Sequence, residues 1–210
     1  MSARGRRDMK KIVLFLVFIS FLGCAGRSPI RDTDLSKSDF PVQHRIRQVP
    51  VYRQASMECG PATLRMVLNY YGKRLSEEDV RKVRRGKLTS VYAMESYPKG
   101  IGFGVYRFHD PGKEKMKLFL SRGYPLIALG VTPPGWTAGQ SYTGEGHYIV
   151  VVGYDESRRI FQVIDPSIGR TLEIPYAVFA NFHAAHPTQA DYVICIYPEV
   201  AKAPGEGPVD

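Results

Sequence analysis

The stretch that decides the fold is residues 54–72, which read Gln54-Ala-Ser-Met-Glu-Cys59-Gly-Pro-Ala-Thr-Leu-Arg-Met-Val-Leu-Asn-Tyr-Tyr-Gly72. After Cys59, apolar side chains recur with the spacing of one helical face, at Leu64, Val67, Leu68 and Tyr71. The proline two residues after Cys59 suits a first helical turn, and Gly72 suits the stop. We therefore predict a helix that begins next to Cys59 and turns one face toward a core.

The rest of the chain predicts further helices first and strands afterwards. A capping signal at residues 76–79 opens a short basic helix that should run to about residue 85, and another is expected over 91–97, before Pro98. Strand patterns cover 103–108, 125–131, 147–154, 160–164, 171–174 and 191–197, and helix patterns cover 113–122 and 175–182. This order predicts an α+β domain, with an N-terminal helical part packed on a C-terminal antiparallel sheet.

Composition excludes several classes of protein. The chain has 210 residues, enough for one domain with a buried core, and it carries a net charge of +9. A basic surface could favour anionic envelope polymers or membranes, but an ordinary solvated surface explains the same charge. The basic residues do not gather with aromatic residues on one element, so nucleic acid is not expected as a partner. No C-x-x-C or H-E-x-x-H spacing occurs, and no metal or cofactor is predicted.

The first 24 residues have the pattern of a targeting segment. Basic residues precede an apolar run over 12–22, which is too short to cross a bilayer of about 30 Å as a helix. The run ends in Phe21-Leu22-Gly23-Cys24, which resembles a bacterial lipoprotein box, where a lipid is attached to the cysteine after cleavage. The resemblance implies a signal peptide over 1–23, a fatty-acid anchor such as palmitate at Cys24, and a domain held at the cell envelope outside the cytoplasm.

Two alternatives for this segment stay open, a plain secretory signal and an uncleaved anchor. Ala25 follows the cysteine, which in a diderm host favours the outer membrane as the destination. Residues 24–48 are polar and irregular, and we interpret them as a tether. Residues 201–210 are rich in glycine and proline, and we interpret them as a disordered tail. The folded domain is therefore expected over residues 49–200.

Cys59 is the first candidate for chemistry. A cysteine attacks as a thiolate, and the unpaired amides and positive dipole at a helix N-terminus favour that form. Gln54 lies on the approach to the same turn, where its amide could donate to a developing oxyanion beside the Cys59 backbone N–H. A buried structural thiol explains Cys59 alone equally well. Cys195 lies in an apolar strand pattern and is expected to be a buried thiol, although an oxidising envelope would permit a disulfide between the two.

His147 and Asp165 supply the other parts of a candidate site. His147 opens one strand pattern and Asp165 ends the next, so a hairpin would place a carboxylate beside the second ring nitrogen of the histidine. Taken separately, they have structural explanations, a satisfied histidine and a turn carboxylate before proline. Trp136, in the loop before His147, could line a substrate groove or anchor the loop. His183 and His186 follow a predicted helix and are expected at the surface.

Three motifs occur in a set order along the chain. They are the Cys-Gly-Pro-Ala-x-Leu-x-Met run at Cys59, the Gly-His-Tyr-Ile-Val-Val-Val-Gly-Tyr-Asp strand at His147, and the Asp-Pro turn at Asp165. In this order they resemble the C39 family of papain-like cysteine peptidases over about residues 49–197. The resemblance implies a papain-like fold and a peptide or protein substrate. It also implies Cys59 as nucleophile, His147 as general base, Asp165 as the orienting residue and Gln54 as the oxyanion donor.

Founding members of that family cleave double-glycine leader peptides within bacteriocin exporters, and two features of this chain depart from them. No Walker motif or long apolar run follows the domain, and the lipoprotein-like start places the domain outside the cytoplasm. Leader-peptide processing is therefore not implied, and no substrate is assigned. Two other functions stay open: amide hydrolysis or acyl transfer on a non-protein envelope substrate, and a catalytically silent module that binds peptides in its cleft.

Overall fold

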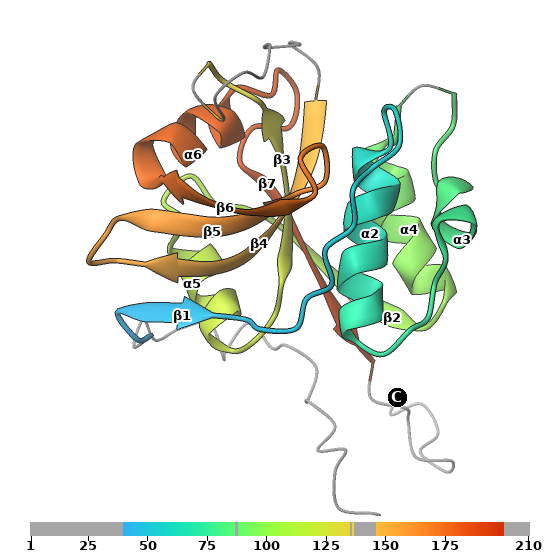
Figure 1. Ribbon diagram of the computed structural model, residues 1–210, viewed down its shortest axis with the longest axis horizontal. Helices are drawn as coiled ribbons and strands as arrows, with labels where there is room; N and C mark the ends of the chain where they lie inside the picture. Colours follow the sequence, from blue (N-terminus) through green and yellow to red (C-terminus); the bar gives the residue numbers. More distant parts are fainter. Residues whose placement is uncertain (1–39, 87, 135, 137–145, 200–210) are drawn as a thin grey trace, which may run out of the picture. The chain divides into compact units, whose positions relative to one another are not determined.

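The helix predicted at Cys59 is present as α2, Cys59–Tyr70, in the computed structural model of the chain (Figure 1). The structure describes residues 40–86, 88–134, 136 and 146–199, all of which belong to one compact unit within residues 29–199. Leu64, Val67 and Leu68 are buried, as their helical spacing predicted. Gly72 takes a left-handed conformation (φ 88°), which lets the chain turn away from the end of the helix.

The next two helices form where they were predicted but end elsewhere. Helix α3, Glu77–Arg81, begins with the expected capping box at Ser76 and ends before residue 85. Beyond it, two backbone N–H groups bond three residues back, which tightens the chain into turns. Helix α4, Val91–Gly100, runs through Pro98 instead of stopping before it. A proline in the last turn costs this helix only one backbone hydrogen bond, and Pro98 is buried there.

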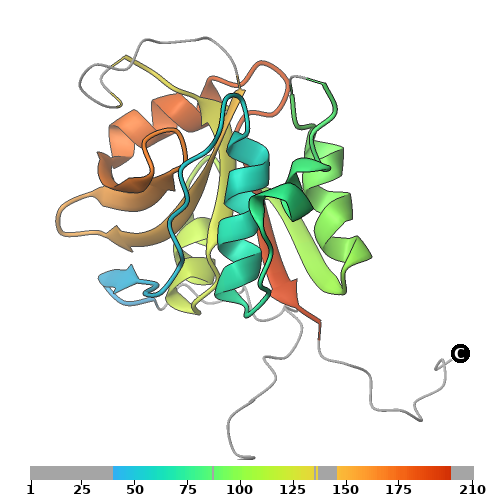
Figure 2. The same cartoon turned by 45° about the vertical axis from the view of Figure 1, so that its right-hand side comes forward.

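The second half of the chain forms the predicted sheet. The described strands pair antiparallel in the order β2-β7-β3-β4-β5-β6 (Figures 1 and 2). They are β2 (Phe103–His109), β3 (Leu126–Val131), β4 (Gly146–Asp155), β5 (Ile160–Asp165), β6 (Arg170–Pro175) and β7 (Tyr192–Pro198). Helices α5 (Glu114–Ser121) and α6 (Tyr176–Ala184) follow β2 and β6. The predicted α+β class, with N-terminal helices on an antiparallel sheet, is confirmed.

One strand lies where a tether was expected. Strand β1, Gln43–Arg45, pairs antiparallel with the end of β4, and Ile46 after it is buried. Gly153 makes room for this contact, because a Cβ there would come within 2.6 Å of a carbonyl oxygen of β1. The sheet therefore includes residues before 49, where the folded domain was expected to begin. Three residues held by backbone hydrogen bonds leave no alternating pattern for sequence reasoning to detect.

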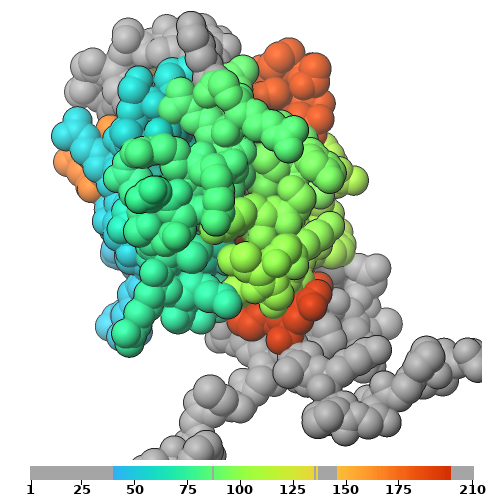
Figure 3. All heavy atoms as spheres, turned by 90° about the vertical axis from the view of Figure 1, so that its right-hand side faces the viewer, coloured from blue at the N-terminus to red at the C-terminus, as the bar shows by residue number. Residues whose placement is uncertain are grey.

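The helical part and the sheet meet where α2 packs against β4. Helices α3 and α4 form much of the face shown in Figure 3, whereas α6 packs on β3, away from these two helices (Figure 1). The N-terminus of α2 and the beginning of β4 lie at the same end of the domain (Figure 1). Cys59, the first residue of α2, and His147, the second residue of β4, are therefore brought to the same end of the domain.

Candidate active site

Cys59 is the first residue of α2 and lies half-buried in the wall of a cleft. Gly60 follows it for a steric reason, since a Cβ there would come within 2.7 Å of the Thr89 side chain. Glu58 occupies the N-cap position, but its side chain forms ion pairs with arginines at 3.1 and 3.2 Å instead of capping the helix. Amide groups of the first turn are thereby left without a side-chain cap beside the sulfur.

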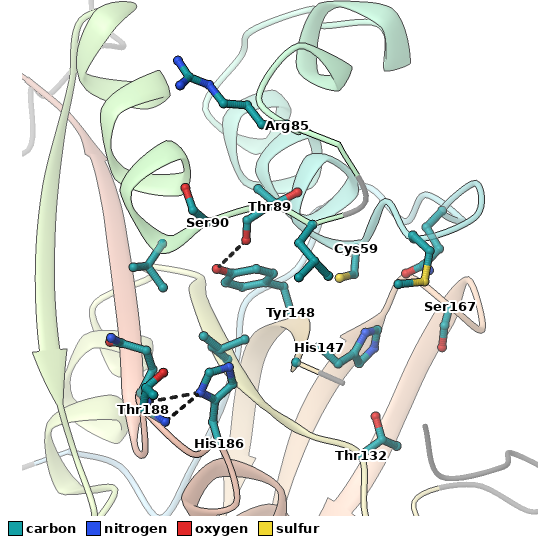
Figure 4. Close-up of a pocket in the computed structure, with 17 residues that line it drawn as sticks. Cys59, Arg85, Thr89, Ser90, Thr132, His147, Tyr148, Ser167, His186 and Thr188 are labelled. Carbon is teal, nitrogen blue, oxygen red and sulfur yellow. Dashed lines mark hydrogen bonds between the residues drawn. The ribbon is translucent and has the colours of Figure 1, made fainter. Parts of the chain in front are cut away.

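His147 faces Cys59 from the start of β4, and Asp165 stands behind the histidine at the end of β5. The antiparallel pairing of the two strands sets Val150 opposite Ile164, which brings His147 and Asp165 to the same end of the hairpin. The Nε2–H of His147 donates to Asp165 Oδ1 at 3.0 Å. The His147 side chain also hydrogen-bonds Cys59, and Figure 4 shows the sulfur and the ring turned toward the same space. The three residues therefore form one hydrogen-bonded series.

Asp165 is fully buried, and each of its carboxylate oxygens accepts hydrogen bonds. Besides His147, Oδ1 accepts from the Ser167 backbone N–H at 2.8 Å and from its hydroxyl at 2.6 Å. Oδ2 accepts from the indole Nε1–H of Trp136 at 2.8 Å. Trp136 is itself buried and its ring lies 4.6 Å from that of Phe182, so it anchors the carboxylate and does not line the cleft. Of the two roles considered for Trp136, the structure supports the anchor.

The charges of the series follow from these contacts. Burial alone would raise the pKa of Asp165, but the hydrogen bond and charge of His147, helped by Ser167 and Trp136, lower it to about 2. Burial would lower the pKa of His147, but its bonds to Asp165 and Cys59 raise it to about 9. Burial would raise the pKa of Cys59, yet His147 and backbone hydrogen bonds hold it below its ordinary value. The site therefore favours a thiolate paired with an imidazolium near neutral pH.

Gln54 lines the same cleft as Cys59. Its backbone N–H donates to the Pro166 carbonyl at 2.8 Å, which ties the approach to α2 to the turn that follows Asp165. Its side-chain Oε1 is buried and has no hydrogen-bond partner among the described residues. Gln54 and Cys59 therefore line one cleft, and the Gln54 side-chain oxygen takes no part in the hydrogen bonds of the described residues.

The cleft has a volume of about 620 Å³ and separates the loop before α4 from the segment after α6. It is lined by Gln54, Met57, Cys59, Arg85, Leu88, Thr89, Ser90, Val91, Leu129, Thr132, Gly146, His147, Tyr148, Ser167, His186, Thr188 and Gln189. Most of these residues carry no chemical signature in the sequence, and they come together only through the fold. Tyr148 crosses the floor, where its hydroxyl donates to the Thr89 carbonyl at 3.3 Å.

The two histidines expected at the surface behave differently. His183 is fully buried in α6, where its Nε2 lies 3.1 Å from the Tyr192 carbonyl, so the surface prediction was wrong. Burial lowers its pKa to about 4 and keeps the ring neutral. Its position on the apolar face of α6 next to Phe179 and Phe182 was the available signal, and the polar side chain hid it. His186 is half-buried and lines the cleft, for which the sequence offers no local pattern.

Several predictions concern parts of the chain that the structure does not describe. Cys24, the segment 1–23 and the tail 201–210 lie outside the described residues. Within residues 40–199, apart from the gaps already given, no helix has the length and apolar character needed to cross a bilayer. The same described residues contain no group of three histidine, cysteine or acidic side chains able to hold a metal ion.

Comparisons with known proteins agree with the geometry. A family model described as "Peptidase_C39 like family" matches residues 46–190, whereas no curated protein matches the chain. A putative C39-like peptidase from Bacillus anthracis has a similar structure, with a TM-score of 0.58 at 14% identity over 75% of this chain and 98% of that chain. A double glycine motif protease from an AMS/PCAT transporter, solved with a leader peptide, gives 0.51 at 23% identity over 75% and 99%.

A more distant similarity extends to procathepsin B of Trypanosoma congolense, with a TM-score of 0.58 at 12% identity over 83% of this chain and 84% of that chain. At these identities the likeness concerns the fold alone. It confirms the papain-like fold that the sequence predicted.

Proposed function

The chain belongs to the peptidase C39-like family, and we propose that it is a cysteine peptidase of the bacterial cell envelope that works through Cys59, His147 and Asp165. The observation that carries this proposal is the hydrogen-bonded series of these three residues in the wall of a cleft. The Asp165 carboxylate is buried and accepts four hydrogen bonds, one of which orients His147. Binding a peptide alone would not require a histidine held in this way. A complete series of this kind favours catalysis over binding alone.

The proposed reaction begins with the thiolate of Cys59 attacking a substrate carbonyl carbon. The resulting oxyanion receives hydrogen bonds from the Cys59 backbone N–H and the Gln54 amide. As the C–N bond breaks, the His147 imidazolium gives its proton to the leaving amine, which leaves an acyl group on the sulfur as a thioester. His147 then takes a proton from water, the hydroxide attacks the thioester, and the acid is released with the thiolate restored. Asp165 holds the ring in place through Nε2.

The substrate we propose is a peptide or an extended segment of a protein. The cleft has a volume of about 620 Å³, which is large enough to hold several residues of a bound chain. The transporter-derived double glycine motif protease was solved with a leader peptide bound, which supports a peptide for this chain as well. Double-glycine leaders themselves are not part of the proposal.

The test of the activity is cleavage of a mixed-sequence peptide library followed by mass spectrometry. The wild-type protein should cut a subset of peptides, and Cys59→Ala should cut none of them. Cys195→Ala serves as the matched control, because it removes a thiol that is buried in the sheet and does not line the cleft. Uncut peptides with the wild-type protein, or equal cutting by Cys59→Ala, would overturn the proposed activity.

The envelope location is a separate part of the proposal and rests on the sequence of residues 12–24 alone. When the full chain is expressed in a bacterial host, it should take up labelled palmitate and partition into detergent. Cys24→Ser should abolish the label, whereas Cys195→Ser should retain it. Equal labelling of the wild-type chain and Cys24→Ser would exclude the lipid anchor without affecting the peptidase assignment.

A further inference from the structure

A second histidine lines the active-site cleft and has no role in the reaction described above. His186 follows α6 and packs against Gly146, the residue directly before His147. A Cβ at Gly146 would come within 3.0 Å of His186 Nε2, so the glycine makes room for the ring. Figure 4 shows the His186 ring projecting into the cleft beside Thr188. The same built Cβ at Gly146 would lie 3.5 Å from the apolar side chain of Leu129, which also lines the cleft.

The chemical state of the ring follows from its own hydrogen bonds. Two backbone N–H groups, those of Thr188 and Gln189, donate to His186 Nδ1 at 3.4 and 3.2 Å. A nitrogen that accepts two such bonds must keep its lone pair, so the proton of the neutral ring lies on Nε2. Burial lowers the pKa of His186 below its ordinary value, which agrees with a neutral ring. The nitrogen nearest Gly146 is therefore a hydrogen-bond donor.

The two histidines of the cleft consequently offer different chemistry. His147 presents to Cys59 the nitrogen that exchanges a proton, because its Nε2 is engaged by Asp165. His186 presents an N–H whose proton cannot readily leave, because Nδ1 is held as an acceptor. No acceptor for His186 Nε2 is found among the described residues. The His186 Nε2–H is therefore a donor without an acceptor among the described residues. A peptide bound in the cleft could supply that acceptor.

We propose that His186 is a substrate-positioning residue whose Nε2–H donates to a main-chain carbonyl oxygen of the peptide in the cleft. The inference rests on the proposed peptidase function and deepens it. An extended peptide offers a carbonyl oxygen at every residue, and such an oxygen must find a donor when the cleft removes it from water. Because the contact is made to the main chain, it is independent of the substrate side chains.

The experiment compares two reagents that label the same sulfur in the full chain. Iodoacetamide reports on Cys59 alone, whereas a pool of mixed-sequence tetrapeptidyl acyloxymethyl ketones must also occupy the cleft. His186→Phe should slow labelling by the peptidyl pool about five- to tenfold, the effect of one lost hydrogen bond, and leave iodoacetamide labelling unchanged. His186→Gln replaces the ring N–H donor by a side-chain amide N–H donor and should recover part of the rate. His44→Phe, on strand β1, is the matched control.

A second arm identifies the oxygen that is bound. In the fastest peptidyl reagent, each amide carbonyl is replaced in turn by a methylene group. One replacement should slow labelling of the wild-type protein about five- to tenfold. The same replacement should not slow labelling of His186→Phe any further. Equal rates of wild type and His186→Phe with the peptidyl pool would overturn the inference while iodoacetamide labelling still supports the thiolate. If no peptidyl reagent labels the wild-type protein faster than iodoacetamide does, both the inference and the peptidase proposal fail.

Discussion

The two cysteines of the described residues carry the same thiol group, but their positions in the fold differ in the features that set its reactivity. Cys59 opens helix α2 and lies half-buried in the cleft. Cys195 lies in the middle of β7, between Tyr106 of β2 and Leu126 of β3, and is fully buried. Burial raises the pKa of Cys195 with nothing to oppose it. The same effect acts on Cys59, but there His147 and backbone hydrogen bonds outweigh it.

The difference shows that the place of a thiol in the fold decides its chemistry. The end of a helix leaves backbone amides available and allows a side chain to face a cleft. The middle of a central strand offers neither, because its amides pair with neighbouring strands and its side chains pack in the core. The following predictions test this contrast, beginning with the largest effect.

The first prediction concerns the reactivity of the two thiols within one molecule. At pH 6, iodoacetamide should alkylate Cys59 more than about a thousandfold faster than Cys195, because Cys195 is a thiol that reacts only when the core opens. Peptide mapping by mass spectrometry of the folded protein after graded exposure measures both rates. In urea the two rates should converge, which shows that the difference belongs to the fold. Comparable rates in the folded protein would remove the contrast altogether.

The second prediction concerns Gln54, which should matter for turnover and not for the thiolate. Gln54→Ala removes a proposed oxyanion donor and should reduce kcat about 10²- to 10³-fold, with little change in the alkylation rate of Cys59. The measurement is kcat on a peptide identified from the library, together with iodoacetamide labelling. Gln54→Glu is a size-matched control that replaces the donor by an acceptor and should be at least as slow. If Gln54→Ala kept the wild-type kcat, Gln54 would not be the oxyanion donor.

The third prediction tests the source of the low pKa of Cys59. His147→Ala removes the hydrogen bond and charge that lower the pKa, and the burial that remains should raise it above about 8.5. Because a thiol of that pKa is only about 0.3% ionised at pH 6, alkylation there should fall about a hundredfold. In the wild type the pair persists as pH falls until the thiolate protonates, and it is lost as pH rises through about 9, where His147 deprotonates.

The measurement is the pH profile of iodoacetamide labelling from pH 4 to 10. His183→Ala is unsuitable as a control because that ring is buried in the core, whereas His44→Ala lies outside the site. A His147→Ala profile that matches the wild type would mean that the helix terminus alone activates the sulfur.

The fourth prediction is a smaller effect at the far end of the series. Trp136→Phe keeps an aromatic ring against Phe182 but removes the N–H that donates to Asp165 Oδ2. Because Ser167 and His147 still hold the carboxylate, turnover should fall only about three- to tenfold and alkylation should hardly change. Steady-state kinetics at fixed pH measure the loss. A loss as large as that expected for His147→Ala would assign Trp136 a role beyond anchoring.

Much of this fold could be predicted because its signals are local. Helix α2 repeats apolar residues at helical spacing, and strands β3, β4 and β7 each contain an apolar run. The failures are also local in cause. Helix α4 passes through Pro98 because the proline falls in the last turn, and β1 is three residues long with its stability in backbone bonds. The spacing of apolar residues does not reveal either a proline tolerated in a last helical turn or a strand of three residues.

The site divides in the same way. Cys59, His147 and Asp165 could be proposed because each stands at the end of an element, where residues from separate motifs can meet. The contacts that support them could not, since the Trp136 bond to Asp165 spans 29 residues and joins a loop to a strand end. His186 reaches the cleft from a segment with no motif of its own. Such contacts depend on tertiary packing and leave no trace in spacing.

The last prediction returns to Cys195, which was expected to be a buried thiol and is fully buried. Cys195→Val keeps an apolar side chain of similar size on a central strand, so the free energy of unfolding in urea should change by less than about 1 kcal/mol. Cys195→Ser places a hydroxyl among apolar neighbours and should cost about 1–3 kcal/mol. Both variants should retain full peptidase activity and full alkylation of Cys59. If Cys195→Val instead reduced turnover while the protein stayed folded, β7 would be coupled to the cleft and the two thiols would not be independent.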